Sequence, residues 1–446
     1  MSPQGFSFSQ DRLREIARDI LDYARGHGAT ACEIDVSEGF GQSVTVRRGE
    51  VETIEYNRDK GVGVTTYIGQ QRGHASTSDY SPSALHATAD AALSIARFTA
   101  PDPCAGLPDE SLLAHGSVDQ DLYHPWPLGV EEAIELARRC ESAAFAVSPL
   151  ITNSEGATVS TQQAHFISAN SLGFEGGYAT SRHYVSCAVI AGESDAMQRD
   201  DWYSSKRDAG DLAQPEAVGE YAAHRALARL EARKIGTLSV PVLFEAPLAA
   251  TLIGNFVHAA SGGALYRKSS FLIDSLGKRI FAPQVRISER PHLKKAFASG
   301  PFDDDGVATH DREVVEGGVL KGYFLSVYSA RKLGMQTTAN AGGCHNLILE
   351  PGDRDLEGLL ELMGRGLLVT ELLGMGVNYV TGDYSRGAAG YWVEQGEIQY
   401  PVHEITIAGN LRDMFSGIAA VGNDVLVRGS KQTGSILIER MTLAGN

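Results

Sequence analysis

Cysteine is scarce in this sequence of 446 residues. Only Cys32, Cys104, Cys140, Cys187 and Cys344 occur, and no two of them are spaced as Cys-x-x-Cys. An odd number of scattered cysteines indicates neither a disulfide framework nor a thiolate zinc site. The pattern favours a reducing compartment, so we expect a cytoplasmic protein.

Basic residues and long apolar runs are also lacking. There are 39 Lys and Arg against 55 Asp and Glu, a net charge of −16, and no block of cations that could neutralise a phosphate backbone. No apolar run approaches the roughly 18 residues of a membrane span, and residues 1–14 do not have the pattern of a signal peptide. We therefore expect a soluble protein that binds neither nucleic acid nor membrane.

Glycine, by contrast, is abundant. The 49 glycines lie between short apolar runs rather than in tracts, which predicts many tight turns between strands. Hydrophobic residues at 43% and charged residues at 21% are ordinary globular values. The length exceeds that of one ordinary core, so we expect two domains, or three at most.

The first half combines helices with strands. From Cys32 to Ser78 apolar residues alternate with polar ones, which predicts an antiparallel meander with turns at Arg48-Gly49 and Lys60-Gly61. A proline-containing stretch, 99–128, predicts a surface connection. Helical periodicity is found over four segments: 9–23, 82–98, 129–147 and 216–232.

The second half contains more strands and hairpins. Hairpins are predicted at 312–326 and 391–408, and Asn410 is placed to cap a helix over 411–420 that Gly422 would end. An apolar helix is predicted over 246–260, after a strand that ends at Phe244. Antiparallel hairpins with segregated helices predict an α+β fold, with an N-terminal domain at 1–235 and a β-rich C-terminal domain at 236–446.

Motifs of known chemistry are missing. No HExxH sequence occurs, and His403-Glu404 falls in a predicted strand, whose alternation would direct the two side chains to opposite faces. The acidic run Asp303–Gly306 lacks the spacing of a calcium loop and is interpreted as a solvated turn. Two Ser-x-x-Lys matches, Ser275–Lys278 and Ser329–Lys332, have no accompanying motif. The residues alone therefore assign no catalytic residue and no metal ligand.

Two glycine-rich segments nevertheless carry charges that a scaffold does not need. In 382–392, glycines surround Asp383, Ser385 and Arg386, and such a loop could hold an extended peptide or a partner. The alternative is that the glycines serve turns and that Asp383 pairs with Arg386. In 261–269, glycines precede Arg267 and Lys268, where the alternative is a helix end with solvated charges.

These segments resemble a known family. The resemblance is carried by Tyr266–Leu272 (YRKSSFL), Asp274–Lys278 (DSLGK), Tyr328–Gly334 (YSARKLG), Gly382–Gly390 (GDYSRGAAG), Glu397–Val402 (EIQYPV) and Glu404–Leu411 (EITIAGNL). The chain is identified by them as similar to the PmbA (TldE) branch of the TldD/PmbA proteins, also called modulators of DNA gyrase or peptidase family U62.

The resemblance implies a cytoplasmic heterodimer of a TldD-like and a PmbA-like subunit. Such a complex is a zinc-dependent peptidase that degrades unfolded or extended peptides and matures a gyrase-targeting microcin. The TldD branch carries HExxxH, whereas the matching positions here hold Gly254, Asn255 and Ala259, with His258 beside them. The tail 429–434 also lacks the cysteine of that branch. The resemblance therefore implies a supporting subunit without a cofactor, and zinc in a TldD-like partner.

Candidate residues for binding substrate or partner are Arg267, Lys268, Asp383, Tyr384, Ser385 and Arg386. Two other functions stay open at this point. The chain could hold an atypical metal site built from His258, His345, His403 and Glu404. It could instead be a non-proteolytic, chaperone-like regulator of gyrase-targeting peptides. Whether the isolated chain forms a homodimer is also open.

Overall fold

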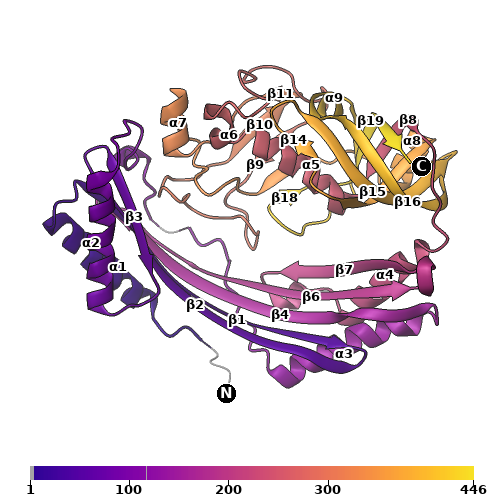
Figure 1. The fold of residues 1–446 in the computed structure, drawn as a ribbon, viewed down its shortest axis with the longest axis horizontal. Helices are drawn as coiled ribbons and strands as arrows, with labels where there is room; N and C mark the ends of the chain where they lie inside the picture. Colours follow the sequence, from indigo (N-terminus) through magenta and orange to yellow (C-terminus); the bar gives the residue numbers. More distant parts are fainter. Residues whose placement is uncertain (1–4, 117, 446) are drawn as a thin grey trace.

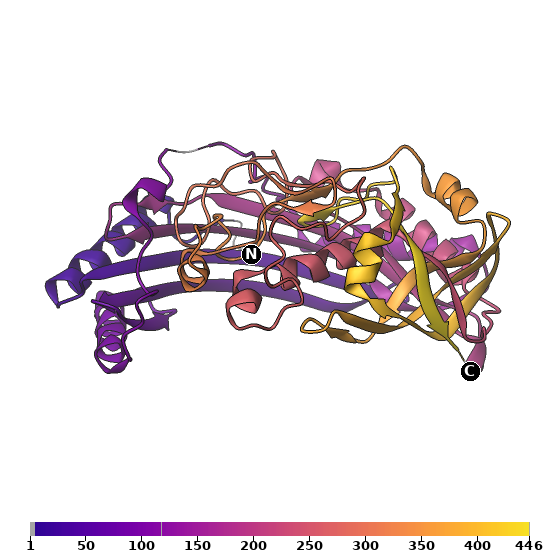
Figure 2. The same cartoon turned by 90° about the horizontal axis from the view of Figure 1, so that it is seen from above.

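The computed structural model describes residues 5–116 and 118–445 and has the expected α+β architecture. One sheet is formed entirely by residues 31–206, and two further sheets are formed by residues 238–444. The later elements lie on the concave side of the first sheet (Figure 1). Seen from above, the strands of the first sheet run along the long axis of the molecule beneath them (Figure 2). The boundary near residue 235 stays a prediction.

The first sheet is antiparallel, with the order β3-β2-β1-β4-β6-β7 and with β5 paired to β4. Its strands are β1 (Ala31–Arg47), β2 (Glu50–Ile68), β3 (Gln71–Thr77), β4 (Ile151–Asn170), β5 (Glu175–Gly176), β6 (Ala179–Ala191) and β7 (Gln198–Lys206). The meander is confirmed, and Arg48 and Gly49 form its first turn with φ of 52° and 78°. The turn predicted at Lys60-Gly61 is wrong, because both residues continue β2 opposite Glu38 and Ser37.

Four helices cover the convex face in two pairs (Figure 1). They are α1 (Gln10–Gly26), α2 (Pro82–Phe98), α3 (Val130–Val147) and α4 (Pro215–Ala228), the last ending earlier than predicted. One pair packs on a cluster that includes Ile34, Val36 and Ile167, and the other on a cluster that includes Val46 and Val159. Alternation along each strand places these apolar side chains on the same face.

The described residues of the connection 99–129 and of two later loops form short 3₁₀ turns, and Leu113 forms an isolated bridge with Val307. The turns are η1 (Glu110–Leu112), η2 (Ser194–Ala196) and η3 (Ala209–Asp211). Leu113 of the connection packs with Phe174 and Phe302, which joins the two halves of the chain. Within the described ranges, no helix is both long and apolar enough to cross a bilayer.

The second half contains a small sheet and a closed one. The small sheet has the order β11-β10-β9-β12-β18, formed by β9 (Ile287–Glu289), β10 (Arg312–Glu316), β11 (Val319–Leu320), β12 (Leu347–Leu349) and β18 (Lys431–Gln432). The other has the order β13-β8-β19-β16-β15-β14, and β13 also pairs with β15, which closes it into a barrel. Its strands are β8 (Leu238–Phe244), β13 (Gly366–Leu373), β14 (Val377–Asn378), β15 (Asp383–Glu394), β16 (Glu397–Asn410), β17 (Ile418–Val421, on β19) and β19 (Ile436–Ala444).

Five helices accompany these sheets: α5 (Ala246–Ala259), α6 (Gly262–Tyr266), α7 (Val327–Leu333), α8 (Leu356–Met363) and α9 (Leu411–Ser416). The hairpin turn at Gln395-Gly396 is confirmed, with φ of 54° and 79°. Asn410 caps α9 as predicted, by accepting a hydrogen bond from Arg412 N. The predicted extension of that helix to residue 420 is wrong, because Ile418–Val421 pair with β19 instead.

Candidate functional site

Helix α5 carries the positions at which the TldD branch is expected to hold its metal ligands. Asn255 is buried, and its side-chain oxygen accepts a hydrogen bond of 2.9 Å from the Tyr379 hydroxyl. Ala259 is completely buried, and its carbonyl accepts a hydrogen bond from the Ser270 hydroxyl. Gly254 offers no side chain at all. None of these three residues can supply a ligand or a general base.

Tyr379 covers this part of α5. Besides its hydrogen bond to Asn255, its ring lies against the exposed His258, with 3.9 Å between the ring centroids and 32° between the planes. Burial raises the pKa of the Tyr379 hydroxyl, and the positive charge of Arg386 opposes that shift. Tyr379 comes from the turn before β15, and no local pattern in the sequence pointed to its contact with α5.

Lys431 lies on another side of Gly254. Its Cε is 3.7 Å from the position that a β-carbon at Gly254 would occupy, and its Nζ is 3.3 Å from Ser430 Oγ. Lys431 begins β18, which pairs in parallel with β12 and places the tail beside α5. An ammonium group at this point would repel a dication bound to the same helix face. The segment 429–434 contains no cysteine, and Lys431 is its single ionisable residue.

The Cys344 thiol lies close enough to this tail to interact with Lys431 and Ser430. Burial raises the pKa of Cys344, and the positive charge of Lys431 opposes that shift in part. A raised pKa leaves less thiolate, which is the form that binds metals and attacks electrophiles. Cys344 therefore lacks the lowered pKa of an activated nucleophile.

The residues of the open metal-site hypothesis do not converge. His345 places Nε2 2.9 Å from the Ala339 carbonyl and Nδ1 3.2 Å from that of Ala298. Glu404 forms a surface ion pair of 2.8 Å with Lys234. Across residues 5–116 and 118–445, no group of three or more His, Cys, Asp or Glu side chains could hold a metal ion. The residues present around α5 thus do not fit the zinc that the resemblance places in the TldD branch.

The glycine-rich segment after Gly382 is a strand rather than a loop. β15 pairs with β16 on one side and with β13 and β14 on the other, so its backbone is already engaged. Asp383 and Ser385 are exposed, whereas Tyr384 and Arg386 lie on the opposite face of the strand and are mostly or partly buried. The four candidates in this segment are therefore divided between two faces.

Asp383 does not pair with Arg386. Its carboxylate accepts hydrogen bonds of 2.6 Å from the Thr381 hydroxyl and 3.1 Å from the Asn410 side-chain amide, which lower its pKa. Tyr384 is 1% exposed, and burial raises its pKa to about 12 against the opposing charge of Arg386. Asp383 thus holds Asn410, the residue that caps α9. Arg386 supplies a positive charge beside the half-buried Tyr379 and the buried Tyr384.

Arg267 and Lys268 follow α6, a helix that the sequence did not predict. Ser261 caps α6, and Lys268 has a φ of 57° that turns the chain away. Both cations are exposed, and the Arg267 guanidinium lies over the ring of Tyr266, 5.1 Å from its centroid. The two positive charges are therefore free to meet an anionic group in solution.

Beside these cations lies a cleft of about 310 Å³ between α5, α6, α7 and the loop 340–344. Val257 of α5, Tyr266 of α6 and Cys344 of the loop line it. Tyr266 also meets Tyr328 of α7 edge-on, with 5.9 Å between the ring centroids. Val257 belongs to α5, so the cleft adjoins the helix that carries the positions of the missing ligands, and Tyr266 precedes the two exposed cations in sequence.

Two other sequence candidates have structural roles. Asp303 is not part of a solvated turn: it is 4% exposed, its pKa is raised by burial to about 7, and it accepts backbone hydrogen bonds from Asp305, Val307 and Ala341. Ser329 forms a capping box with Ser326 at the start of α7. Neither residue is available as a metal ligand or nucleophile.

Comparison with known proteins covers nearly the whole chain. Family models match over 32–96 (PmbA/TldA metallopeptidase domain 1), 123–230 (central domain) and 237–445 (C-terminal domain). A relative from Escherichia coli O157:H7, described as metalloprotease PmbA, is 48% identical over 97% of this chain and 96% of its own. A relative from Haemophilus influenzae, described as a metalloprotease PmbA homolog, is 46% identical over 98% and 97%.

Solved structures share the fold. A proposed modulator of DNA gyrase from Bacteroides thetaiotaomicron superposes with a TM-score of 0.93 at 27% identity, covering 98% of this chain and all of its own. TldE from Thermococcus kodakarensis has the same fold, with a TM-score of 0.81 at 19% identity over 96% of this chain and all of its own. A zinc metalloprotease TldD homolog from Saccharolobus solfataricus is 29% identical over 45% of this chain and 49% of its own. The chain belongs to the PmbA/TldD metallopeptidase family, in its PmbA branch.

Proposed function

We propose that this chain is the metal-free, supporting subunit of a two-subunit zinc peptidase that processes extended or unfolded peptides in the cytoplasm. The observation that carries the proposal is the composition of the α5 face, where Gly254 lies beside Lys431 and Asn255 is engaged by Tyr379. A TldD-like partner would supply the zinc and the general base. The existence of a relative described as a zinc metalloprotease TldD homolog supports such a partner.

The cleft beside α5 is the proposed contact region. Arg267 and Lys268 would hold a carboxylate of the peptide or of the partner, since both are exposed in a chain of net charge −16. Asp383 and Ser385 would make polar contacts from the exposed face of β15. Tyr384 and Arg386 would act as positioning residues, because Tyr384 is 1% exposed and cannot reach a partner itself.

Strand pairing with the partner would use a different part of the chain. β3 pairs with β2 only over Val62–Ile68, and no strand of the described chain pairs with the outer edge of residues 50–60. All eleven residues of this open arm are exposed, including Val51, Ile54 and Tyr56. An open edge with apolar side chains is a template for a further strand. We assign the arm to the partner subunit.

The experiment that tests this function compares the chain alone, a TldD-like partner alone and their equimolar mixture. Zinc content and hydrolysis of casein and of an unstructured peptide are measured for each. We expect stoichiometric zinc wherever the partner is present and full hydrolysis only in the mixture. Chelator-sensitive hydrolysis by this chain alone would overturn the proposal. Protection of gyrase-inhibiting peptides without any cleavage by the mixture would favour a chaperone-like regulator instead.

The contact region is tested with a matched pair of double variants. Arg267→Ala with Lys268→Ala removes the cations beside the cleft, whereas Lys278→Ala with Arg279→Ala removes two adjacent exposed cations elsewhere. We expect the first pair to raise the KM of the mixture for an acidic peptide several-fold, because a charge contact is lost. Equal effects of both pairs would show that net charge alone matters.

A further inference from the structure

A polar band interrupts the apolar face of the first sheet. Gln42, Thr161 and Gln163 are 4%, 6% and 7% exposed, and they lie between the cluster under α1 and α2 and the cluster under α3 and α4. Strand register places Gln42 directly opposite Thr161. Buried polar side chains of this kind cost free energy unless each is hydrogen-bonded. Gln42 is the member of this band whose amide nitrogen has no partner among the described residues, so its presence calls for a reason other than packing.

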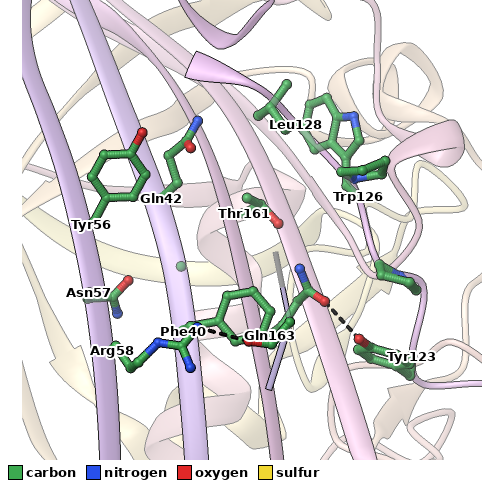
Figure 3. A pocket seen from close by; sticks show the side chains of 14 residues that line it. Phe40, Gln42, Tyr56, Asn57, Arg58, Tyr123, Trp126, Leu128, Thr161 and Gln163 are labelled. Carbon is green, nitrogen blue, oxygen red and sulfur yellow. Dashed lines mark hydrogen bonds between the residues drawn. The ribbon is translucent and has the colours of Figure 1, made fainter. Parts of the chain in front are cut away.

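A cavity of about 380 Å³ lies over the polar band. Figure 3 shows the Gln42 side chain between Tyr56 of β2 and Thr161 of β4, with Trp126 and Tyr123 on the opposite wall. The segment 123–128 supplies that wall as it crosses from the connection toward α3. An aromatic-walled cavity of this size with a few convergent polar groups is typical of a small-molecule site.

The polar band forms the floor of the cavity, and its hydrogen bonds determine whether the Thr161 hydroxyl donates or accepts. His183 Nε2 is 2.8 Å from the His124 carbonyl, which can only accept, so Nε2 carries the proton. Burial lowers the pKa of His183, so the ring is neutral at pH 7 and its Nδ1 accepts. Thr161 Oγ1, 3.0 Å from Nδ1, is therefore the donor in that contact. Its lone pairs are left to accept a hydrogen bond from a molecule in the cavity.

The two glutamines present donors. The Tyr123 hydroxyl donates a hydrogen bond of 2.9 Å to Gln163 Oε1. The amide nitrogen of Gln163 is therefore the atom left to donate to a molecule in the cavity. Nε2 of Gln42 is buried and has no hydrogen-bond partner among the described residues. The floor thus offers an unpartnered N–H donor at Gln42 next to an acceptor at Thr161. That pattern is complementary to a group with a carbonyl adjacent to an N–H.

We propose that this cavity binds a neutral, flat aromatic compound with a lactam or primary carboxamide edge. The carbonyl would accept from Gln42 Nε2, the N–H would donate to Thr161 Oγ1, and the ring would lie between Tyr56 and Trp126. Charged ligands are disfavoured, because Arg58, the ionic side chain among the described lining residues, already forms an ion pair of 2.8 Å with Glu38. The proposal does not depend on the role of the chain as a peptidase subunit.

The test is a titration of the full-length chain with isocarbostyril, a two-ring lactam, followed by saturation-transfer NMR. We expect saturable binding at one site with a Kd of roughly 0.1 to 5 mM, as for other ligands of this size. Gln42→Met keeps the length of the side chain and removes the donor, and should weaken binding by about tenfold. The variant removes a buried unpaired amide, so it is expected to fold.

Gln71→Met is the matched control. Gln71 lies on β3, does not line the cavity and donates hydrogen bonds to the carbonyls of Arg97 and Thr99, so its replacement should leave the Kd unchanged. N-methylisocarbostyril, which lacks the N–H, should bind at least several-fold more weakly than isocarbostyril. Absence of saturable binding would overturn the proposal. Equal affinity for Gln42→Met and the unaltered chain, or for the two lactams, would overturn it as well.

Discussion

Lys431 and Gly254 face each other where the TldD branch is expected to bind its metal. The Lys431 Cε lies 3.7 Å from the position of a β-carbon on Gly254, which is an ordinary van der Waals distance. A methyl group would therefore fit at position 254, whereas a metal ion would meet the ammonium group. The α5 face thus has no zinc ligands at these positions and has a protein cation beside them.

Replacing Gly254 with Ala should stabilise the protein. Gly254 lies inside α5, and Ala is favoured over Gly in a helix by about 1 kcal/mol when no clash occurs. We expect a rise of about 0.5 to 1 kcal/mol in the free energy of unfolding, measured by urea denaturation. A loss of stability would mean that Lys431 packs more tightly on the helix than its position indicates.

Gly262→Ala is the contrasting control for that measurement. A β-carbon at Gly262 would stand 2.2 Å from Ser329 Oγ and 2.4 Å from Ser329 Cβ. Ser329 belongs to the capping box of α7 and cannot move away freely. We expect Gly262→Ala to lower the free energy of unfolding by roughly 1 to 3 kcal/mol.

The stability of the protein should fall as pH rises because of Glu33. Burial raises the pKa of Glu33 from 4.5 to about 7, and the hydrogen bond from Tyr67 opposes this shift. A folded-state pKa above the unfolded value favours the protonated form, so its contribution is fully present below pH 4.5 and is lost as pH rises through 7. Glu33→Gln should therefore stabilise on the order of 1 kcal/mol at pH 8 and hardly at all near pH 4.5.

Thermal unfolding of Glu33→Gln across this pH range checks the prediction. Glu52→Gln serves as the control, because Glu52 is exposed and makes only a surface ion pair of 3.3 Å with Arg47. A gain for Glu33→Gln that does not change with pH would contradict the assigned titration.

Local patterns predicted those parts of the fold that depend on neighbours in sequence. Alternation gave the strands around Ile34 and Val46, and the glycines at Gly49 and Gly396 gave their turns, because left-handed backbone there favours glycine. Gly61 misled the prediction, since it continues β2 in extended backbone opposite Ser37. Closure of the barrel through β13 and β15 depends on pairing between distant segments and left no periodic signal.

In the candidate site, too, the sequence predicted the features that are local and missed the contacts between distant segments. The missing ligands at Gly254 and Asn255 were evident from the sequence, because a motif on one helix is local. The contacts of Lys431 with α5 and of Tyr379 with Asn255 bring together distant segments, so they required the structure. The polar band was missed because Gln42 and Thr161 are polar residues in the expected alternation, and only strand register shows that they lie under a cavity.

Arg225 should contribute strongly to the connection between α4 and the second half of the chain. Its guanidinium contacts Glu245 Oε1 at 2.8 Å and Asp200 Oδ1 at 3.2 Å, and the three side chains are 14%, 12% and 11% exposed. Arg225→Met would leave the mostly buried Glu245 without its ion-pair partner, and Asp200 would keep only its longer contact of 3.5 Å with Arg229. We expect a loss of about 3 kcal/mol in the free energy of unfolding, measured by urea denaturation.

The pH dependence of that loss separates an ionic effect from a packing effect. Burial raises the pKa of Glu245, and Arg225 opposes that shift, so its removal should raise this pKa further. The loss should then be larger at pH 8 than at pH 5, because the unpaired carboxylate must stay charged at the higher pH. Arg139→Met, which breaks a surface ion pair with Glu216, should cost less than about 1 kcal/mol at either pH. Equal losses for Arg225→Met at both pH values would indicate lost packing alone.

The open arm of β2 should determine assembly with a partner. Ile54 is 44% exposed on an edge that no described strand pairs, so Ile54→Asp should place a charge in the interface and weaken association of the mixed complex by at least about tenfold. Ile273→Asp is the matched control, since Ile273 is 38% exposed on the other half of the chain. Light scattering of the equimolar mixture with a TldD-like partner gives the mass of the complex. The mass of the isolated chain, measured in the same way with and without Ile54→Asp, shows whether it forms a homodimer through the same arm. Unchanged association of Ile54→Asp, or equal weakening by both variants, would exclude the arm as the interface.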